Sequence, residues 1–286
     1  MNRLILTHRS EIPQILVKKI FEQYGVLSHR SLSIKTMEFH CAQSFDLKSK
    51  KALQQLANES STDTIFLKET FHPKQIQLLA FDMDSTLINI ECIDEIARQC
   101  GKVEEVSKIT EASMRGEIKD FSESLIARVS LLKGVYASDL EIVYQERLGL
   151  NPGAENLIQA AKAMGWKTLL VSGGFTFFTN KIKDLLQLDE AHSNTLEIIG
   201  GRLTGRVLGP IVDGAAKASF VKLACARLGV STQAALVMGD GSNDLPMMAN
   251  AGLSIGYQPK PIVQEKADGT FQFVGLDGVL DLFQAD

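Results

Sequence analysis

The sequence predicts an α/β protein built on a doubly wound, mostly parallel sheet, with a helical insert and a small α+β domain at its N-terminus. From residue 76 onward, apolar runs alternate with helical segments, and each run ends in polar or glycine-rich residues. Continuous apolar strands of this kind are typical of a parallel sheet covered by helices on both faces. Residues 1–75 follow a different order, in which two neighbouring strands lie between two helices.

The first 75 residues are predicted to fold as a small domain in the order β-α-β-β-α-β, a split βαβ arrangement. Apolar residues at helical spacing indicate its helices, and short apolar runs indicate its strands. The expected strands are Leu4–Thr7, Ser31–Thr36, Glu38–Phe45 and Thr64–Leu67, and the expected helices are Ile12–Tyr24 and Leu47–Asn58. The polar stretch Lys68–Gln75 is expected to be a linker, and no residue of this domain belongs to a recognisable catalytic motif.

Residues 76–286 are predicted to form the larger domain, with a core of residues 76–90 and 151–286 and a helical cap of about 91–150. The insert between Ile93 and Leu150 is rich in Glu, Lys and Arg, as expected of solvated helices. A two-residue turn at Gly200-Gly201 predicts a hairpin. The expected strands are Ile76–Asp82, Lys167–Ser172, Ala234–Asp240 and Leu253–Gly256 in the parallel sheet, and Leu196–Ile199 with Arg202–Val207 in the hairpin.

Composition excludes several classes of protein. The formal net charge is −4 and no dense Lys/Arg block occurs, which argues against binding to nucleic acid or to a membrane surface. The four cysteines are scattered, without a CxxC pair, so reduced thiols are expected. The first residues lack the apolar core of a secretory signal, and no run approaches the ~20 apolar residues of a membrane span. A cytoplasmic location is therefore expected.

Reactive residues follow three of the predicted parallel strands. The first strand leads into Asp82-Met83-Asp84, the second into Ser172-Gly173-Gly174, and the third into Asp240-Gly241-Ser242-Asn243-Asp244. Ligands of open parallel sheets bind beyond the carboxyl ends of the strands, where these three segments would meet. Acidic turns often cap helices, but three such segments together are better explained by one active site.

The residue types favour phosphoryl transfer. A carboxylate such as Asp82 can attack phosphorus, provided that a hard divalent cation offsets the negative charge on both partners. Mg²⁺ prefers oxygen ligands, and Asp82 and Asp240 are the candidate carboxylate ligands. Asp84, two residues further along an extended backbone, is placed to protonate the leaving alcohol and then to activate water.

Phosphate also needs hydrogen-bond donors and a fixed positive charge. Ser172 and the Gly173 backbone N–H are expected to form a small cradle, supported by Gly174, because glycine permits close approach. Lys217 is the candidate positive charge on the transferring group, and Asn243 could donate to a phosphate oxygen. Asp244 is expected to orient either Lys217 or the metal shell.

At these residues the chain resembles the haloacid dehalogenase superfamily, and the segments FDMDSTLI, VSGGF and GDGSNDLPM are similar to motifs of its phosphoserine phosphatases. The resemblance covers roughly Ile76 to the C-terminus. It implies a Rossmann-like hydrolase core with Asp82 as nucleophile and Asp84 as acid/base. It also implies Mg²⁺ held by Asp82, Asp240 and the Asp84 main-chain carbonyl, with phosphate bound by Ser172, Gly173, Lys217 and Asn243.

Within the cap, the resemblance implies a substrate pocket for O-phosphoserine, made by Glu91, Met114, Phe121 and Arg128. The substrate carries an α-ammonium and an α-carboxylate, which require an acid and a guanidinium. Glu91 and Arg128 meet that requirement, while Met114 and Phe121 would exclude water on closure. The implied role is the last step of serine biosynthesis.

Several alternatives stay open. The protein could act on another small phosphate, transfer the phosphoryl group to an alcohol, serve as a phospho-accepting switch, or be an amino-acid-binding regulator. Hydrolysis promoted by Asp84 disfavours the switch, and the Glu91–Arg128 pair disfavours other substrates. The N-terminal domain resembles ACT-like regulatory modules, so ligand sensing, homodimer formation and simple packing are its alternative roles.

Overall fold

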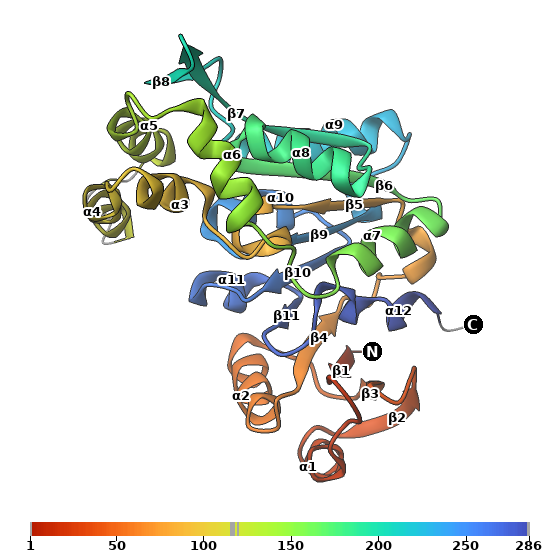
Figure 1. Ribbon diagram of the computed structural model, residues 1–286. Coiled ribbons are helices and arrows are strands. Elements are labelled where there is room, and N and C mark those ends of the chain that lie inside the picture. The colour runs from red at the N-terminus through yellow and green to blue at the C-terminus, as the bar shows by residue number, and fades with distance from the viewer. Residues whose placement is uncertain (1, 115–117, 119, 285–286) are drawn as a thin grey trace.

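The protein is an α/β structure with one continuous 11-stranded sheet, described here from a computed structural model for residues 2–114, 118 and 120–284 (Figure 1). The strands follow the order β2-β3-β1-β4-β11-β10-β9-β5-β6-β7-β8. The strands from β11 to β7 pair in parallel, whereas β8 and the four N-terminal strands pair antiparallel. In the described residues, no helix combines the length and apolar character needed to cross a membrane.

The N-terminal domain has the predicted β-α-β-β-α-β order. Its elements are β1 (Asn2–Thr7), α1 (Gln14–Gln23), β2 (Val26–Ser31), β3 (Thr36–Cys41), α2 (Leu47–Asn58) and β4 (Asp63–Leu67). The side chains of Leu4 and Leu6 pack with both helices, while Ile5 faces the opposite side and joins the core cluster of the larger domain. The alternation of side chains along β1 therefore buries both of its faces.

Two strand predictions in this domain are wrong at their boundaries. Of the expected strand Ser31–Thr36, residues 32–35 form the turn between β2 and β3, and the strand expected at Glu38–Phe45 ends at Cys41. The alternation of Ser31-Leu32-Ser33-Ile34 imitates a half-buried strand. The real strand β2 is an edge strand that is exposed along most of its length, so no apolar alternation marks it.

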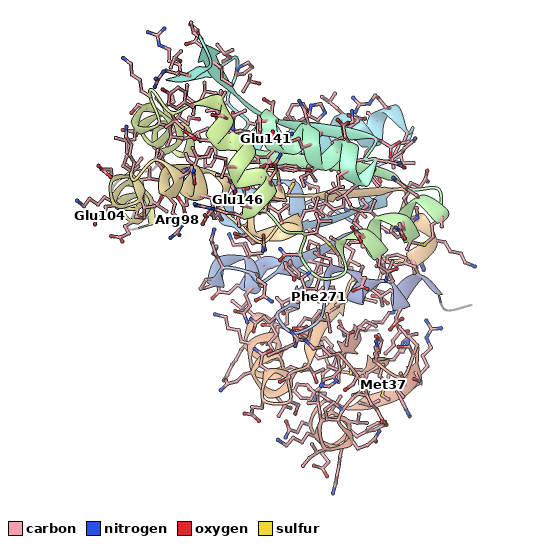
Figure 2. The ribbon with its side chains drawn as sticks, in the orientation of Figure 1. Met37, Arg98, Glu104, Glu141, Glu146 and Phe271 are labelled. Carbon is pink, nitrogen blue, oxygen red and sulfur yellow. The ribbon has the colours of Figure 1, made fainter. Side chains whose placement is uncertain are left out.

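The expected linker packs against the core. Its residue Phe71 is 1% exposed, and Lys68 places its Nζ 3.4 Å from Asp268 Oδ2. Strand β4 pairs with β11, which joins the N-terminal sheet to the core sheet, and the buried Phe271 of β11 lies at this junction (Figure 2). The division of the chain at residue 75 stays a prediction, since the two parts share one sheet.

The core and cap have the predicted alternation of strands and helices. The core contains β5 (Leu78–Phe81), α7 (Ala154–Ala163), β6 (Lys167–Phe175), α8 (Thr176–Leu186), β7 (Glu190–Ile199), β8 (Arg202–Leu208), α9 (Gly214–Arg227), β9 (Ala235–Gly239), α10 (Leu245–Met248), β10 (Leu253–Tyr257), α11 (Pro261–Lys266), β11 (Gly269–Phe271) and α12 (Asp281–Gln284). The insert contains α3 (Cys92–Gln99), α4 (Val103–Met114), α5 (Phe121–Leu131) and α6 (Ala137–Glu146).

Both faces of the central strands are buried, as their continuous apolar sequence indicates. Leu78 and Ala80 of β5 pack in the cluster that includes α9 and α10, whereas Leu79 and Phe81 pack in the cluster that includes α7 and α8. Burial on both faces fixes the strand ends relative to one another. The loops after β5, β6 and β9 therefore emerge together beneath the helical cap (Figure 1).

The hairpin prediction is confirmed. Gly200 and Gly201 have φ of +58° and +74°, the left-handed conformation that a two-residue turn of this type needs, and Ile199 pairs with Arg202. Strand β7 is longer than expected because it starts at Glu190, where its first residues pair with β6. The hairpin also contacts the cap through the Gly134 N–H, which donates to the Leu203 carbonyl at 2.8 Å.

Candidate active site

The loop after β5 places two carboxylates in one cavity. Asp82 ends the strand in an extended conformation, and its Oδ1 accepts a hydrogen bond from the Met83 N–H at 2.7 Å. Asp84 is also extended, and Ser85 then turns the chain with a φ of +55°. Asp84 Oδ1 accepts from the Cys92 N–H at 3.3 Å, at the start of the cap helix α3. The loop thus orients one carboxylate from the core and the other against the cap.

A buried lysine joins the first and third strand-end segments. Lys217 on α9 is 0% exposed, and its Nζ lies 2.9 Å from Asp82 Oδ2 and 2.7 Å from Asp244 Oδ1. Asp244 Oδ2 accepts from the backbone N–H groups of Asp240 and Gly241 at 3.1 and 3.0 Å. Asp244 therefore orients Lys217 and shapes the loop after β9. Burial alone would lower the pKa of Lys217, but the negative charges of Asp244 and Asp82 raise it.

The acidic cluster fits a divalent cation. Oxygens of Asp82, Asp240 and Asp244 lie within 4.8 Å of one another, and Asp82 and Asp240 line the cavity whereas Asp244 is fully buried beneath it. Burial and the charge of Asp244 raise the pKa of Asp82. Burial also raises the pKa of Asp240 to about 6, opposed by Lys260. Divalent cations such as Mg²⁺ bind carboxylate oxygens, so this cluster could hold one.

Asp84 lies where the core meets the cap. Burial raises its pKa to about 7, and the neighbouring carboxylate of Glu91 acts in the same direction. Glu91 in turn accepts a hydrogen bond from Ser85 Oγ at 2.8 Å through Oε1. A carboxyl group in this environment holds a proton more readily than an exposed aspartate.

The loop after β6 forms a tight cradle. Ser172 is 0% exposed, and its Oγ accepts from the Gly174 N–H at 2.8 Å. A Cβ added at Gly173 would lie 2.7 Å from Phe121 Cζ, and one at Gly174 would lie 2.8 Å from Asp84 Oδ2. Close approach of Phe121 and Asp84 therefore favours glycine at these two positions, and both glycines line the cavity beside the carboxylates.

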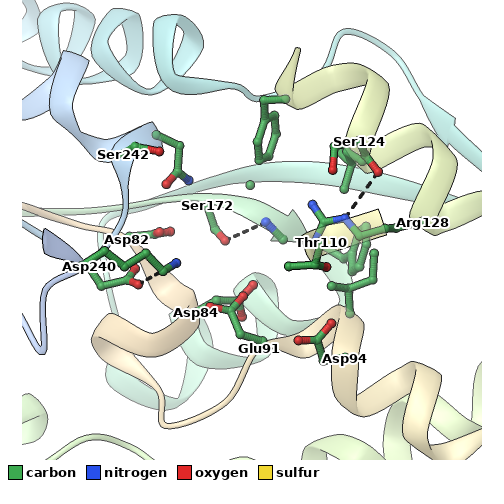
Figure 3. Close-up of a pocket in the computed structure, with 18 residues that line it drawn as sticks. Asp82, Asp84, Glu91, Asp94, Thr110, Ser124, Arg128, Ser172, Asp240 and Ser242 are labelled. Carbon is green, nitrogen blue, oxygen red and sulfur yellow. Dashed lines mark hydrogen bonds and ion pairs between the residues drawn. The ribbon is translucent and has the colours of Figure 1, made fainter. Parts of the chain in front are cut away.

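The cap supplies the opposite wall of the cavity, whose volume is about 350 Å³. Figure 3 shows Asp94 and Arg128 on one side of the pocket and Asp82 and Asp240 on the other. Arg128 Nε donates to the Ser124 carbonyl at 3.3 Å, and burial lowers the pKa of this guanidinium. The lining residues are Asp82, Asp84, Glu91, Ile93, Asp94, Thr110, Phe121, Ser124, Leu125, Arg128, Ser172, Gly173, Gly174, Phe175, Asp240, Ser242, Asn243 and Lys260.

The structure brings nearly all of the predicted site residues together. Lys217 and Asp244 lie directly beneath the cavity, and the other predicted residues whose side chains are described line it. Met114 is the last residue of α4, and its side chain lies outside the part of the chain that is described. The individual roles assigned to these residues stay predictions.

Two residues of the cavity, Lys260 and Asp94, were not predicted from the sequence. Lys260 Nζ lies 3.1 Å from Asp240 Oδ2, and the Lys260 N–H donates to the Asp240 carbonyl at 2.9 Å. Burial opposes the charge of Lys260, but Asp240 and Glu91 raise its pKa. Its position just after β10 was a fourth strand-end signal. Asp94 lies in the first turn of α3, three residues after Glu91, the residue that precedes this helix.

Comparison with known proteins agrees with this geometry. A family model described as haloacid dehalogenase-like hydrolase matches residues 76–252. A phosphoserine phosphatase from Polaromonas sp. is 55% identical over 210 residues, which cover 72% of this chain and 89% of the relative. The chain belongs to the haloacid dehalogenase-like hydrolases.

Two solved structures extend the comparison to particular proteins. The unliganded structure of a probable phosphoserine phosphatase from Vibrio cholerae has a TM-score of 0.80 at 34% identity, covering 99% of this chain and 86% of that one. A phospho-aspartyl intermediate analogue of a phosphoserine phosphatase has a TM-score of 0.67 at 41% identity, covering 72% of this chain and 97% of that one. The fold of the larger part of the chain is thus shared with phosphoserine phosphatases, and the likeness to the Vibrio cholerae protein extends over the N-terminal domain.

Proposed function

We propose that this protein is a Mg²⁺-dependent phosphomonoesterase that hydrolyses O-phosphoserine to serine and phosphate, the last step of serine biosynthesis. One observation carries the proposal. A single cavity holds the Asp82–Asp84 pair on its core side and an acid and a guanidinium, Glu91 and Arg128, on its cap side. The first pair matches a phosphate ester and the second matches the ammonium and carboxylate of an amino acid.

Asp82 is the nucleophile in this reaction. Its carboxylate oxygen attacks phosphorus, the bond from phosphorus to the serine oxygen breaks, and an aspartyl-phosphate forms. Asp84 donates its proton to the departing serine oxygen. Asp84, now a carboxylate, then takes a proton from water, the water oxygen attacks phosphorus, and the bond to Asp82 breaks to release phosphate.

The surrounding residues bind and orient the transferring group. Lys217 holds Asp82 and supplies a fixed positive charge beside it, at a Nζ–Oδ2 distance of 2.9 Å. Ser172, Gly173 and Asn243 donate to phosphate oxygens. Asp82, Asp240 and the main-chain carbonyl of Asp84 would hold Mg²⁺, which neutralises charge on the phosphate when bound.

The cap residues select the substrate. Arg128 binds the α-carboxylate, Glu91 binds the α-ammonium, and Phe121 covers the cradle at Gly173 and excludes water. Met114 is proposed for the same apolar cover, from the resemblance alone. The reaction consumes a small soluble metabolite, in keeping with a cytoplasmic enzyme.

The test is phosphate release from O-phospho-L-serine with Mg²⁺, with EDTA, and with the Asp82→Asn variant. Turnover that needs Mg²⁺, is lost in Asp82→Asn, and exceeds that on phosphothreonine and sugar phosphates would support the proposal. Turnover of other phosphates but not of phosphoserine would keep the Asp82 chemistry and overturn the assignment of Glu91 and Arg128. Product formed with added acceptor alcohols would reveal phosphotransfer.

A long-lived phosphoprotein without turnover would favour the phospho-accepting switch. The place of Asp84 in the same cavity as Asp82 disfavours that outcome, because an acid and base beside the acyl phosphate promotes its hydrolysis. Folded protein that binds an amino acid but turns over no phosphate would instead favour a regulator.

A further inference from the structure

Asp94 is a second acid on the cap wall of the cavity. It lies in the first turn of α3, three residues after Glu91, which is the extended residue that precedes the helix. Both line the cavity together with Arg128 (Figure 3). None of the roles assigned above uses Asp94.

One oxygen of Asp94 lacks a partner. Its Oδ1 is buried and has no hydrogen-bond donor in the described part of the chain. Buried polar atoms in folded proteins are nearly always hydrogen-bonded, and leaving one unsatisfied is costly. Asp94 lies in the first turn of α3, where a negative charge interacts favourably with the helix dipole. This interaction does not provide a hydrogen-bond donor to Asp94 Oδ1.

The neighbouring charged groups leave room for a ligand between them. Arg128 makes its one described hydrogen bond through Nε, so its two terminal nitrogens have no partner among the described residues. Within the same described residues, Asp94 and Arg128 form no ion pair at 4.0 Å or less, although the charge of each affects the pKa of the other. The cap wall therefore presents a guanidinium and two carboxylates that do not neutralise one another by contact.

An α-ammonium matches this arrangement. It carries three N–H donors, and one carboxylate cannot accept all of them in good geometry. Glu91 Oε1 already accepts a hydrogen bond from the Ser85 hydroxyl, so fewer of the Glu91 acceptor sites remain for an ammonium group. Asp94 Oδ1 offers an acceptor three residues further along the chain, on the same wall.

The geometry points to Asp94 as a specificity-determining residue that, together with Glu91, accepts the ammonium group of the amino-acid substrate. The inference rests on the proposed phosphoserine activity and adds to it a second ammonium ligand. The other head-group interaction, between the substrate carboxylate and Arg128, uses a different charged group of the substrate.

The test compares three phosphate esters in wild type and Asp94→Asn. O-phosphoserine carries both head groups, O-phosphoethanolamine carries only the ammonium, and 3-phosphooxypropanoate carries only the carboxylate. Asn keeps the shape of the side chain and removes its charge. We expect kcat/KM to fall at least about tenfold for both ammonium-bearing esters and to change by less than about twofold for 3-phosphooxypropanoate.

The matched control is Glu95→Gln, which removes an acid from the same helix turn. Glu95 is not among the residues that line the cavity, and its Oε2 lies 2.8 Å from Arg147 Nη1. It should retain the wild-type ranking of the three esters. Thermal midpoints of both variants show whether the cap remains folded.

Each other outcome overturns the inference. Equal losses on all three esters would give Asp94 a purely structural role, and losses confined to the two carboxylate-bearing esters would make it a positioning residue for Arg128. Unchanged kcat/KM on every ester would remove it from the site. Failure of the proposed function has a separate signature, because wild type itself would then show no preference for O-phosphoserine over 3-phosphooxypropanoate.

Discussion

Lys217 Nζ lies 2.9 Å from Asp82 Oδ2, and both side chains are almost completely removed from solvent. The lysine reaches Asp82 from helix α9, at whose N-terminus Asp213 accepts a hydrogen bond from the Ala216 N–H at 2.8 Å. Asp244 Oδ1 also forms an ion pair with Lys217 Nζ, at 2.7 Å. The lysine therefore links the first and third strand-end loops through two ion pairs.

Replacing Lys217 by Met should damage both activity and stability. The substitution leaves Asp82 and Asp244 buried without their counter-charge, which should lower the free energy of unfolding by about 3–5 kcal/mol. Loss of the fixed charge should lower kcat by at least about a hundredfold. Urea titration and steady-state kinetics measure the two effects. Lys222→Met, at an exposed position of the same helix, is the control, and equal behaviour of the two variants would contradict the prediction.

Gly173→Ala should prevent full closure of the cap. The new Cβ would lie 2.7 Å from Phe121 Cζ, so the ring and helix α5 must move away from the cradle. We expect kcat/KM for phosphoserine to fall by about tenfold or more. The same substitution should cost less in a Phe121→Ala background, where the clash is absent. Equal losses in both backgrounds, measured as a double-mutant cycle, would show that Phe121 is not the obstacle.

Asp240→Asn should abolish stabilisation by Mg²⁺. A cation that binds only the folded state stabilises it by about 2.7 kcal/mol at a hundred times its Kd, and chelation by EDTA should reverse this gain. The variant removes one negative charge from the cluster of Asp82, Asp240 and Asp244. Its melting temperature should therefore not change when Mg²⁺ is added. Glu104→Gln, an exposed change on the cap (Figure 2), should keep the full response. A Mg²⁺ shift in Asp240→Asn equal to wild type would place the cation elsewhere.

The sequence was most informative where burial on both faces made strands apolar throughout. Such runs located β5, β6, β9 and β10, and the residues after three of them predicted the catalytic side of the cavity. It was least informative for two strands. Strand β2 lies at the sheet edge and is polar and exposed, whereas β11 lies inside the sheet between β10 and β4 but has only three residues, so no local pattern marked either strand.

The cap side of the site depended on tertiary contacts. Residue types alone left Glu91 and Arg128 indistinguishable from solvated helix residues, and only the resemblance to a known family singled them out. Asp94 and Lys260 joined the cavity through the packing of α3 and α11 against the core, which the sequence does not specify. The spacing of three residues would have indicated that Asp94 lies near Glu91, but not that it lines the pocket.

Glu38 should make stability depend on pH in the acid range. Its side chain is buried between Arg3 and Arg30, whose Nε atoms lie 2.5 and 2.6 Å from its oxygens, with His40 Nε2 at 3.5 Å. Burial alone would raise the pKa of Glu38, but the two arginines hold it below its ordinary value of 4.5. Stability from this carboxylate is therefore present above pH 4.5 and is lost as the pH falls through the folded-state pKa.

Glu38→Gln should lose about 2 kcal/mol of unfolding free energy at pH 7, and less at pH 3 to 4. Urea titrations at several pH values, with Glu22→Gln as the exposed control, measure the difference, and a gap that stays constant with pH would contradict the ion-pair explanation.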